Sequence, residues 1–367
     1  MHSLPLLVIV VVAATAFDFT NGFHDTANVV AASISTRALS PRAAILLASV
    51  LNFAGAFISL KVAATIATGI IDASQVTETI AFAGLIGAIA WNLVTWAYGL
   101  PSSSSHALIG GVIGAMLAGV GGSGVRFVGV LTKVVLPALV APVSAFLLAG
   151  LVILLIYRLV GGGRPGPVTR GFRLGQIVSN SGLAIAHGMN DAQKTMGVIT
   201  LALVAHGSLS PHNVHVPTWV VVLSATAMAL GTYAGGWRII RTVGTRIIRM
   251  NAAQAFSAQA SGAAVILVSS HLGYPLSSTQ VISGGVMGAG AAKRLSAVRW
   301  GVAGSIALAW VITLPVAGLF GAGAYALATA FGSGILAPLL ITVIALGGPI
   351  SMALASRRRR VAEAASA

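Results

Sequence analysis

Three of the six acidic residues in this chain lie inside long apolar segments. Asp18 and Asp25 lie in the apolar segment 4–35, and Asp191 lies in the segment 175–205. A carboxylate at the centre of a bilayer costs about 2.5–3.5 kcal/mol on insertion scales, so it usually faces a polar cavity or an ion pathway. The alternative is a carboxylate that pairs with a basic neighbour only to hold helices together. We favour a functional role for Asp25 and Asp191, and for Asp18 both interpretations stay open.

Polar side chains surround the two favoured acids. They are Thr20, Asn21, His24, Thr26 and Asn28 around Asp25, and Asn190, Gln193 and Lys194 around Asp191. So many polar groups are costly in lipid unless each finds a partner, and together they could bind a cation through oxygens and an anion through donors. We predict that Asp25, Asp191, Asn21, His24 and Asn190 couple a cation. A satisfied interior histidine at position 24, and a Lys194 that reaches the interface, remain the alternatives.

Two similar stretches provide the signal for an anion. Residues 99–114 align without a gap on residues 273–288, and each stretch has a Gly-x-Pro-x-Ser-Ser start. We expect Pro101 and Pro275 in the first turn of a helix that serine or threonine caps. The N-terminus of a helix carries about +0.5 charge and free N–H groups, which suit an oxyanion. The alternative is a pair of ordinary capped helices whose glycines allow tight packing.

The elements that position these residues are predicted to be membrane helices. Hydrophobic residues make up 57% of the chain and charged residues only 7%, whereas a soluble domain has roughly 25% charged residues. The apolar segments lie near 4–35, 42–66, 79–100, 102–120, 128–160, 175–205, 217–236, 252–272, 275–291, 298–330 and 334–356. We predict an all-α polytopic membrane protein with about 10–12 membrane segments, including broken helices or re-entrant hairpins.

Four of these segments are too long for one straight span. They are the first, fifth, sixth and tenth, and we expect breaks in them, at Pro137 and Pro142 in the fifth and at Pro315 in the tenth. We interpret the apolar run 4–17 as the first span and not as a signal peptide, because it has no basic leader and continues into the polar motif.

Internal similarity predicts a duplicated unit with inverted topology. Gly22–Asp25 matches Gly188–Asp191, and residues 39–41 match 209–211. The loop after the first acidic motif contains Arg37 and Arg42, but its counterpart at 206–216 contains no lysine or arginine. Because cytoplasmic loops are rich in basic residues, the two units face opposite ways. We divide the chain into a first inverted repeat (1–160), a basic cytoplasmic loop (161–174), a second inverted repeat (175–330), and an extra C-terminal span with a basic tail (331–367).

The basic residues argue for a multi-pass protein of the cell membrane. The net charge is +15, but most arginines lie between apolar segments. That pattern fits cytoplasmic loops facing a lipid bilayer and excludes a nucleic-acid partner. We place the N-terminus outside and the C-terminus in the cytoplasm. The chain has no cysteine, which excludes disulfides and thiolate metal sites.

At these motifs the chain resembles the inorganic phosphate transporter (PiT) family, most of all its bacterial low-affinity branch. The resemblance rests on residues 17–28, on residues 186–194 and on both Pro-x-Ser-Ser stretches. It implies secondary symport of inorganic phosphate, a homodimer, and phosphate held between the two halves. The predicted substrate-binding residues are Asp25, Asn28, Ser103, Ser104, Ser105, Asn190, Asp191, Lys194, Ser277, Ser278 and Thr279.

The chain departs from the family pattern at three positions. Asn52 and Gln259 stand where many animal sodium-coupled members have glutamate, and Lys194 stands where other members have asparagine. The coupling cation, H⁺ or Na⁺, and transport of a metal–phosphate complex therefore stay open. Beyond the coupling cation we predict no cofactor, and we assign no metal ligands.

Three other functions are weighed against phosphate symport. The first is a permease of the same fold for sulfate or another oxyanion, and the second is an ion channel. The third is an intramembrane enzyme with Ser105 as nucleophile and His106 as base. Adjacent helical residues point about 100° apart and need not meet, so we predict that the chain is not an enzyme.

Overall fold

The computed structural model describes residues 4–211, 213–235, 240 and 247–330, and these residues form an all-α fold. The described ranges contain no named strand, only one isolated bridge between Ile71 and Val125. The α-helices are α1 (Leu4–Ser35), α2 (Pro41–Gly55), α3 (Lys61–Thr68), α4 (Glu78–Tyr98), α5 (Ser104–Gly119), α6 (Phe127–Val130), α7 (Leu136–Val160), α8 (Pro165–Ala205), α9 (Thr218–Ala234), α11 (Ala252–His271), α12 (Ser278–Ala291) and α13 (Trp300–Ala330). Short helical turns lie at Ala73–Gln75, Gly122–Gly124, Leu131–Val135 and Leu295–Ala297.

Helices of membrane-spanning length dominate the fold. Among the described residues, five helical segments are long and apolar enough to cross a bilayer: α1, α4, the run Phe127–Val160, α11 and α13. The helices α2, α5 and α9 are apolar but shorter. The predicted last span, 334–356, and the basic tail lie outside the described residues.

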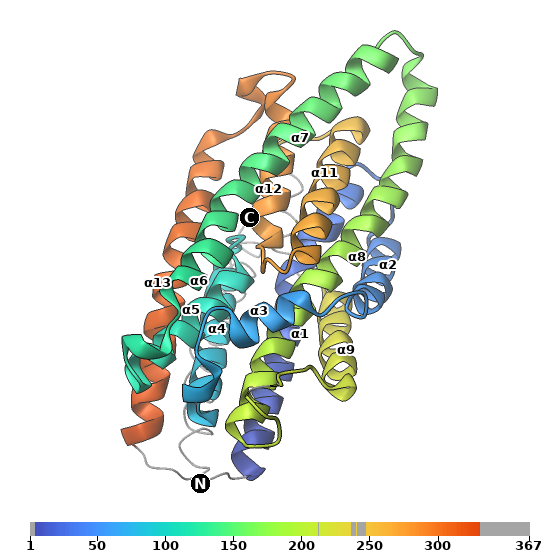
Figure 1. Ribbon diagram of the computed structural model, residues 1–367. Coiled ribbons are helices and arrows are strands. Elements are labelled where there is room, and N and C mark those ends of the chain that lie inside the picture. Colours follow the sequence, from blue (N-terminus) through green and yellow to red (C-terminus); the bar gives the residue numbers. More distant parts are fainter. Residues whose placement is uncertain (1–3, 212, 236–239, 241–246, 331–367) are drawn as a thin grey trace, which may run out of the picture.

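Two helical hairpins approach each other from opposite ends of the molecule. Figure 1 shows α4 and α5 in its lower half and α11 and α12 in its upper half. Their tips meet, because the Ser105 hydroxyl at the start of α5 donates a 2.9 Å hydrogen bond to the Leu276 carbonyl before α12. At 16 and 14 residues, α5 and α12 are shorter than the ~20 residues of a full crossing. This arrangement supports the prediction of re-entrant hairpins.

Glycines bring α5 and α12 close to their neighbours. Gly110 and Gly114 of α5 face α13, and Gly284 and Gly288 of α12 face α7. A Cβ atom on any of the four would lie 2.0–2.3 Å from a backbone oxygen of the neighbouring helix. These glycines therefore allow the tight packing that the alternative explanation predicted. A binding role for the helix starts is still compatible with this packing, because both starts lie where the two hairpin tips meet.

All four predicted helix breaks are wrong. Helices α1, α8 and α13 are continuous over 32, 41 and 31 residues, and α13 accommodates Pro315 without ending. The fifth segment contains a π-helical turn at Leu131–Val135 and not a break. The break lies in the second segment, between α2 and α3. There the Gln193 side-chain oxygen of α8 accepts hydrogen bonds from the N–H groups of Val62 and Ala63. These N–H groups at the start of α3 therefore have a hydrogen-bond partner inside the protein.

Helix α8 also replaces most of the predicted basic loop. Its 41 residues span roughly 60 Å at 1.5 Å per residue, about twice the hydrocarbon thickness. Residues 165–174, predicted as loop, form its first turns, so the helix extends past the apolar region with Arg170 and Arg173 exposed. Arg37 and Arg173 line one cavity of about 610 Å³ at this end of the molecule. Basic residues from distant segments therefore gather at one end, as the charge argument requires.

Candidate functional site

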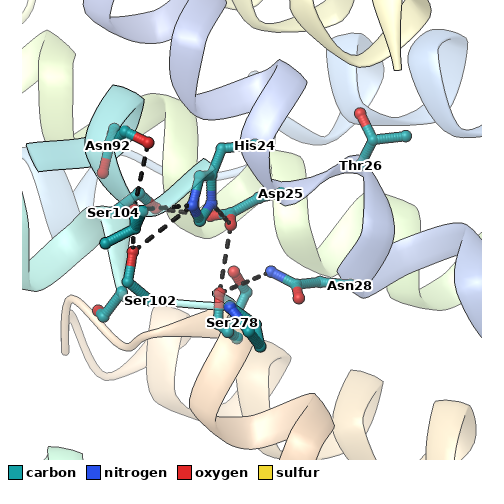
Figure 2. Close-up of polar contacts among 12 residues, drawn as sticks. His24, Asp25, Thr26, Asn28, Asn92, Ser102, Ser104 and Ser278 are labelled. Atoms are coloured by element: carbon teal, nitrogen blue, oxygen red, sulfur yellow. Dashed lines mark hydrogen bonds and ion pairs between the residues drawn. The ribbon is translucent and has the colours of Figure 1, made fainter. Parts of the chain in front are cut away.

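The Asp25 carboxylate of α1 lies where the two hairpin tips meet. One oxygen is 2.9 Å from His24 Nδ1 and accepts a 3.2 Å hydrogen bond from Thr279 of α12. The other accepts a 2.5 Å hydrogen bond from Ser104 of α5. Asn28, one turn further along α1, donates to the Thr279 hydroxyl at 2.8 Å. Figure 2 shows Asp25 facing His24 and Ser104 while Thr26 points away.

The Asp191 carboxylate of α8 has an equivalent set of partners. Ser278 of α12 donates a 3.1 Å hydrogen bond to it, and His187 Nε2 lies 3.1 Å from the same oxygen. The Lys194 ammonium bonds the other oxygen, and it also donates to the Ser105 hydroxyl and to the Leu276 carbonyl. The exposed fraction of the Lys194 side chain is only 1%. Lys194 is therefore an ion-pair partner inside the protein, and its predicted alternative of reaching the interface is wrong.

The two half-sites share one centre. Asp25, His187 and Asp191 each offer a ligand atom, and these atoms lie within 4.8 Å of one another. Each acid binds the tip of its own half through Ser104 or Ser278. Asp25 also contacts the tip of the opposite half directly, through Thr279. Asp191 reaches the opposite tip indirectly, because Lys194 bonds both Asp191 and Ser105. Two carboxylates this close repel each other, so the centre favours cations or protonated groups.

The helix starts beside these acids are capped as predicted, but the prolines lie outside them. Ser103 accepts a 3.1 Å hydrogen bond from the N–H of residue 106, and Ser277 accepts one of 3.3 Å from the N–H of residue 280. Pro101 and Pro275 precede these caps by two residues and do not lie in the first turn. Each capping hydroxyl still has a proton to donate.

The remaining predicted residues are all buried, and they differ in whether they contact one of the two carboxylates. Asn190 donates to the Ser270 hydroxyl at 2.7 Å and to the Tyr274 carbonyl at 3.3 Å, which ties α8 to the second hairpin. His24 contacts Asp25 directly. Asn21 lies one turn before Asp25, and its Oδ1 has no hydrogen-bond partner among the described residues.

The neutral amides Asn52 and Gln259 each lie in a hydrogen-bond network of their own. Asn52 donates a 3.0 Å hydrogen bond to the Thr232 hydroxyl, and its Oδ1 lies 3.3 Å from His187 Nδ1. Gln259 donates to Ser33 at 2.8 Å and to Asn180 at 3.1 Å. Both amides are buried and hydrogen bonded without a charged partner among the described contacts.

Sequence reasoning missed His187, although its position was informative. It lies four residues before Asp191 on α8, so both side chains fall on one face of the helix. The imidazole links Asp191 on one side to Asn52 on the other. In contrast, Ser105 and His106 do not form a nucleophile–base pair: Ser105 binds Leu276 and Lys194, and His106 Nδ1 lies 3.4 Å from Gln280.

Comparison with known families decides the class of protein that carries this centre. The model of the phosphate transporter family matches residues 21–167 and again residues 162–321. The chain belongs to this phosphate transporter family. Each match contains one acidic motif and one Ser-rich hairpin tip, so the family signature covers both halves of the site.

Individual relatives support the same assignment to the phosphate transporter family. A "probable low-affinity inorganic phosphate transporter" of Mycobacterium bovis is 56% identical over 88% of this chain and 77% of its own length. The Bacillus subtilis protein of that name is 43% identical over 88% and 97%. A solved structure named "the sodium-dependent phosphate transporter" superposes with a TM-score of 0.81 at 26% identity, covering 87% of this chain and 98% of that one. The chain is a membrane transporter for phosphate and not an enzyme.

Proposed function

We propose that the chain is a secondary symporter that imports inorganic phosphate with a cation, H⁺ or Na⁺, across the cell membrane. One observation carries this proposal: Asp25 and Asp191 come together between two helix N-termini that supply Ser104, Ser105, Ser278 and Thr279. Helix starts and hydroxyls suit an oxyanion, and paired carboxylates suit cations. A site at the meeting point of two opposed hairpins is the usual arrangement in transporters with inverted repeats.

The charge of the centre explains why anion and cation would travel together. Asp25 and Asp191 bring two negative charges and Lys194 one positive charge, so an arriving phosphate meets net repulsion unless a cation accompanies it. Phosphate that carries a proton can also donate a hydrogen bond to a carboxylate, whereas sulfate at neutral pH cannot. The acids therefore favour phosphate over sulfate as the substrate.

Transport requires a conformational change at this centre. The side chains of Asp25, Asn28, Lys194 and Thr279 are at most 3% exposed. A site closed on both sides belongs to an alternating-access carrier, in which the tips of the hairpins separate toward one side at a time. An open channel would instead keep a continuous polar path.

The same centre supports a metal–phosphate complex as an alternative cargo. Asp25, His187 and Asp191 provide two carboxylates and one imidazole, a ligand set that suits a divalent metal ion. In that case the metal would neutralise the acids and bring its phosphate to the hydroxyls of the tips.

Uptake of radiolabelled phosphate into proteoliposomes tests the proposed function. Sodium and proton gradients are imposed separately, Mg²⁺ is present or replaced by a chelator, and sulfate is added as competitor. We expect accumulation above equilibrium with one of the two gradients and little competition by sulfate. Flux that only equilibrates would indicate a channel, and strong competition by sulfate would indicate a general oxyanion permease. The homodimer that the resemblance implies stays a prediction, and cross-linking in the same membranes tests it.

The hydroxyls at the two tips should contribute modestly and independently. Ser104→Ala or Ser278→Ala removes one hydrogen bond worth about 0.5–1.5 kcal/mol, while the backbone N–H groups remain. Each change should therefore raise the phosphate concentration needed for half-maximal uptake roughly 2- to 10-fold. The double variant should multiply the two effects. Ser305→Ala is the matched control, because the exposed Ser305 hydroxyl on α13 donates to the Gly301 carbonyl and to neither acid. Unchanged uptake kinetics in the double variant would move the anion site elsewhere.

Inverted topology predicts opposite sidedness for two equivalent loops. Ser40, at the start of α2, and Ser210, after α8, are both exposed. In this cysteine-free chain, Ser210→Cys should react with an impermeant thiol reagent from outside, and Ser40→Cys only after permeabilisation. The same experiment tests whether the end of the molecule that contains Arg37 and Arg173 faces the cytoplasm. Equal labelling of both cysteines from one side would contradict the inversion.

A further inference from the structure

Arg37 has a backbone conformation that favours glycine. It follows the end of α1, and its φ of 58° is the one positive φ among the described non-glycine residues. Two backbone hydrogen bonds to the Ser33 carbonyl close α1 at this point, and two bonds to the Leu203 carbonyl close α8 in the same way. At the end of α8, however, the left-handed residue is Gly207, with a φ of 81°. An arginine in this conformation is strained where glycine would not be, which indicates a role for its side chain.

Arg37 lines a cavity that lies between four helix ends. The cavity has a volume of about 610 Å³ and is bounded by the ends of α1 and α7 and by the starts of α8 and α11. Figure 1 shows α7 and α8 joined at the upper end of the molecule. Arg173 of α8 lines the same cavity, and no acidic residue does. Neither arginine forms an ion pair within the described ranges, so nothing there balances their charge.

Both arginines lie at the edge of an apolar segment. Arg37 comes shortly after the segment 4–35, and Arg173 comes shortly before the segment 175–205. Positions at the ends of membrane helices fall near the level where the apolar core of a bilayer meets its headgroups. Basic pockets between helices at this level are suited to the phosphate groups of anionic lipids.

The rest of the cavity wall suits a ligand with a polar part and an apolar part. Ile156, Val160 and Phe172 supply apolar surface, and Tyr157 and Thr169 supply hydroxyls. The volume lies within the roughly 300–1,000 Å³ of sites for organic ligands, so the cavity has room for more than one inorganic phosphate ion. The polar part is expected to be an anion, and a guanidinium group binds phosphoryl oxygens through parallel N–H···O bonds.

We propose that Arg37 and Arg173 bind a phosphoryl group in this cavity, apart from the centre of Asp25 and Asp191. The phosphoryl group can come from the headgroup of an anionic phospholipid or from free inorganic phosphate. The apolar wall and the position near the headgroups favour the phospholipid. The bound ligand would connect the ends of α1 and α8, the two helices that carry the acids of the transport centre. Binding at this cavity does not depend on the proposed symport.

Ligand binding by the purified full-length chain tests this proposal. Phosphatidylglycerol and phosphatidylcholine are titrated separately into the detergent-solubilised protein, and bound lipid is counted by native mass spectrometry. Binding of labelled inorganic phosphate is measured in the Asp25→Asn/Asp191→Asn background, which lacks the acids of the transport centre. We expect one phosphatidylglycerol to bind per chain in preference to phosphatidylcholine.

Arg37→Gln and Arg173→Gln should each weaken the binding of phosphatidylglycerol roughly 5-fold. Arg170→Gln is the matched control, because Arg170 is exposed on the same helix but does not line the cavity. Binding of inorganic phosphate that Arg37→Gln and Arg173→Gln weaken would support the site and identify free phosphate as the source. The proposal is overturned if neither phosphatidylglycerol nor inorganic phosphate binds in a way that depends on these two arginines.

Arg37→Gly separates a role in binding from a role in folding. Glycine relieves the strained backbone and matches Gly207, so without added lipid this variant should melt at or above the temperature of the unmodified chain. Phosphatidylglycerol should raise the melting temperature of the unmodified chain by several degrees, because it binds the folded state, and should not stabilise Arg37→Gly. Equal stabilisation of both proteins by phosphatidylglycerol would overturn the role of Arg37.

Discussion

Asp25→Asn and Asp191→Asn should each abolish coupled phosphate uptake while the protein still reaches the membrane. Asparagine is cheaper to insert into a bilayer than aspartate, which favours membrane insertion of both variants. Asp191→Asn also leaves Lys194 without its ion-pair partner, so this variant should melt at a lower temperature than Asp25→Asn. The amide keeps the shape of the side chain, but it removes the charge that holds the cation. Because the acids share one centre, we expect a loss of at least 100-fold from either change, and no further loss in the double variant.

The measurement is initial uptake of labelled phosphate in proteoliposomes, normalised to the amount of reconstituted protein. Asp72→Asn is the matched control, because Asp72 makes its hydrogen bonds to Ser74 and Gln75 in a connecting turn. That variant should transport normally. Near-normal uptake by both Asp25→Asn and Asp191→Asn would reject the proposed roles of the acids.

Lys194→Met should cause a large loss of stability. Lys194 is the cation that compensates Asp191 in the interior, and removing one partner of a buried ion pair typically costs about 3–5 kcal/mol. The change also frees the Ser105 hydroxyl and the Leu276 carbonyl at the junction of the tips. We expect a marked fall in melting temperature together with a loss of phosphate uptake.

A second change should separate these two effects of Lys194. Asp191→Asn combined with Lys194→Met removes both charges, so the melting temperature should recover in large part while uptake stays absent. Lys61→Met, on the exposed start of α3, is the control for loss of a lysine and should be neutral. If Lys194→Met melts like the unmodified protein, the ion pair with Asp191 does not hold this centre together.

The repeated motifs in the sequence predicted that Asp25, Asp191 and the two Ser-rich stretches belong to one site. The structure adds the pairing within each half, of Asp25 with Ser104 and of Asp191 with Ser278. The contacts between halves could not be predicted in this way. The hydrogen bond of Thr279 to Asp25 and that of Lys194 to Ser105 depend on how two folded hairpins face each other, which no motif spacing specifies.

Helix continuity was predicted least well, for reasons visible in the structure. Length and proline suggested breaks in α1, α8 and α13, but packing keeps these helices whole and α8 extends beyond the apolar region. The break between α2 and α3 has no proline signal. It is stabilised by Gln193, more than a hundred residues away in sequence. Tertiary contacts, and not local propensity, decide where such backbone is tolerated.

Binding of labelled phosphate to the purified protein tests the central claim most directly, because it reports on the site without the rest of the transport cycle. Phosphate binding is measured at fixed pH as the concentration of the coupling cation is raised, for the unmodified chain and for Asp25→Asn. The account predicts that the cation tightens phosphate binding to the unmodified chain at least 10-fold and has little effect on Asp25→Asn. Equal phosphate affinity in both proteins, independent of the cation, would contradict it.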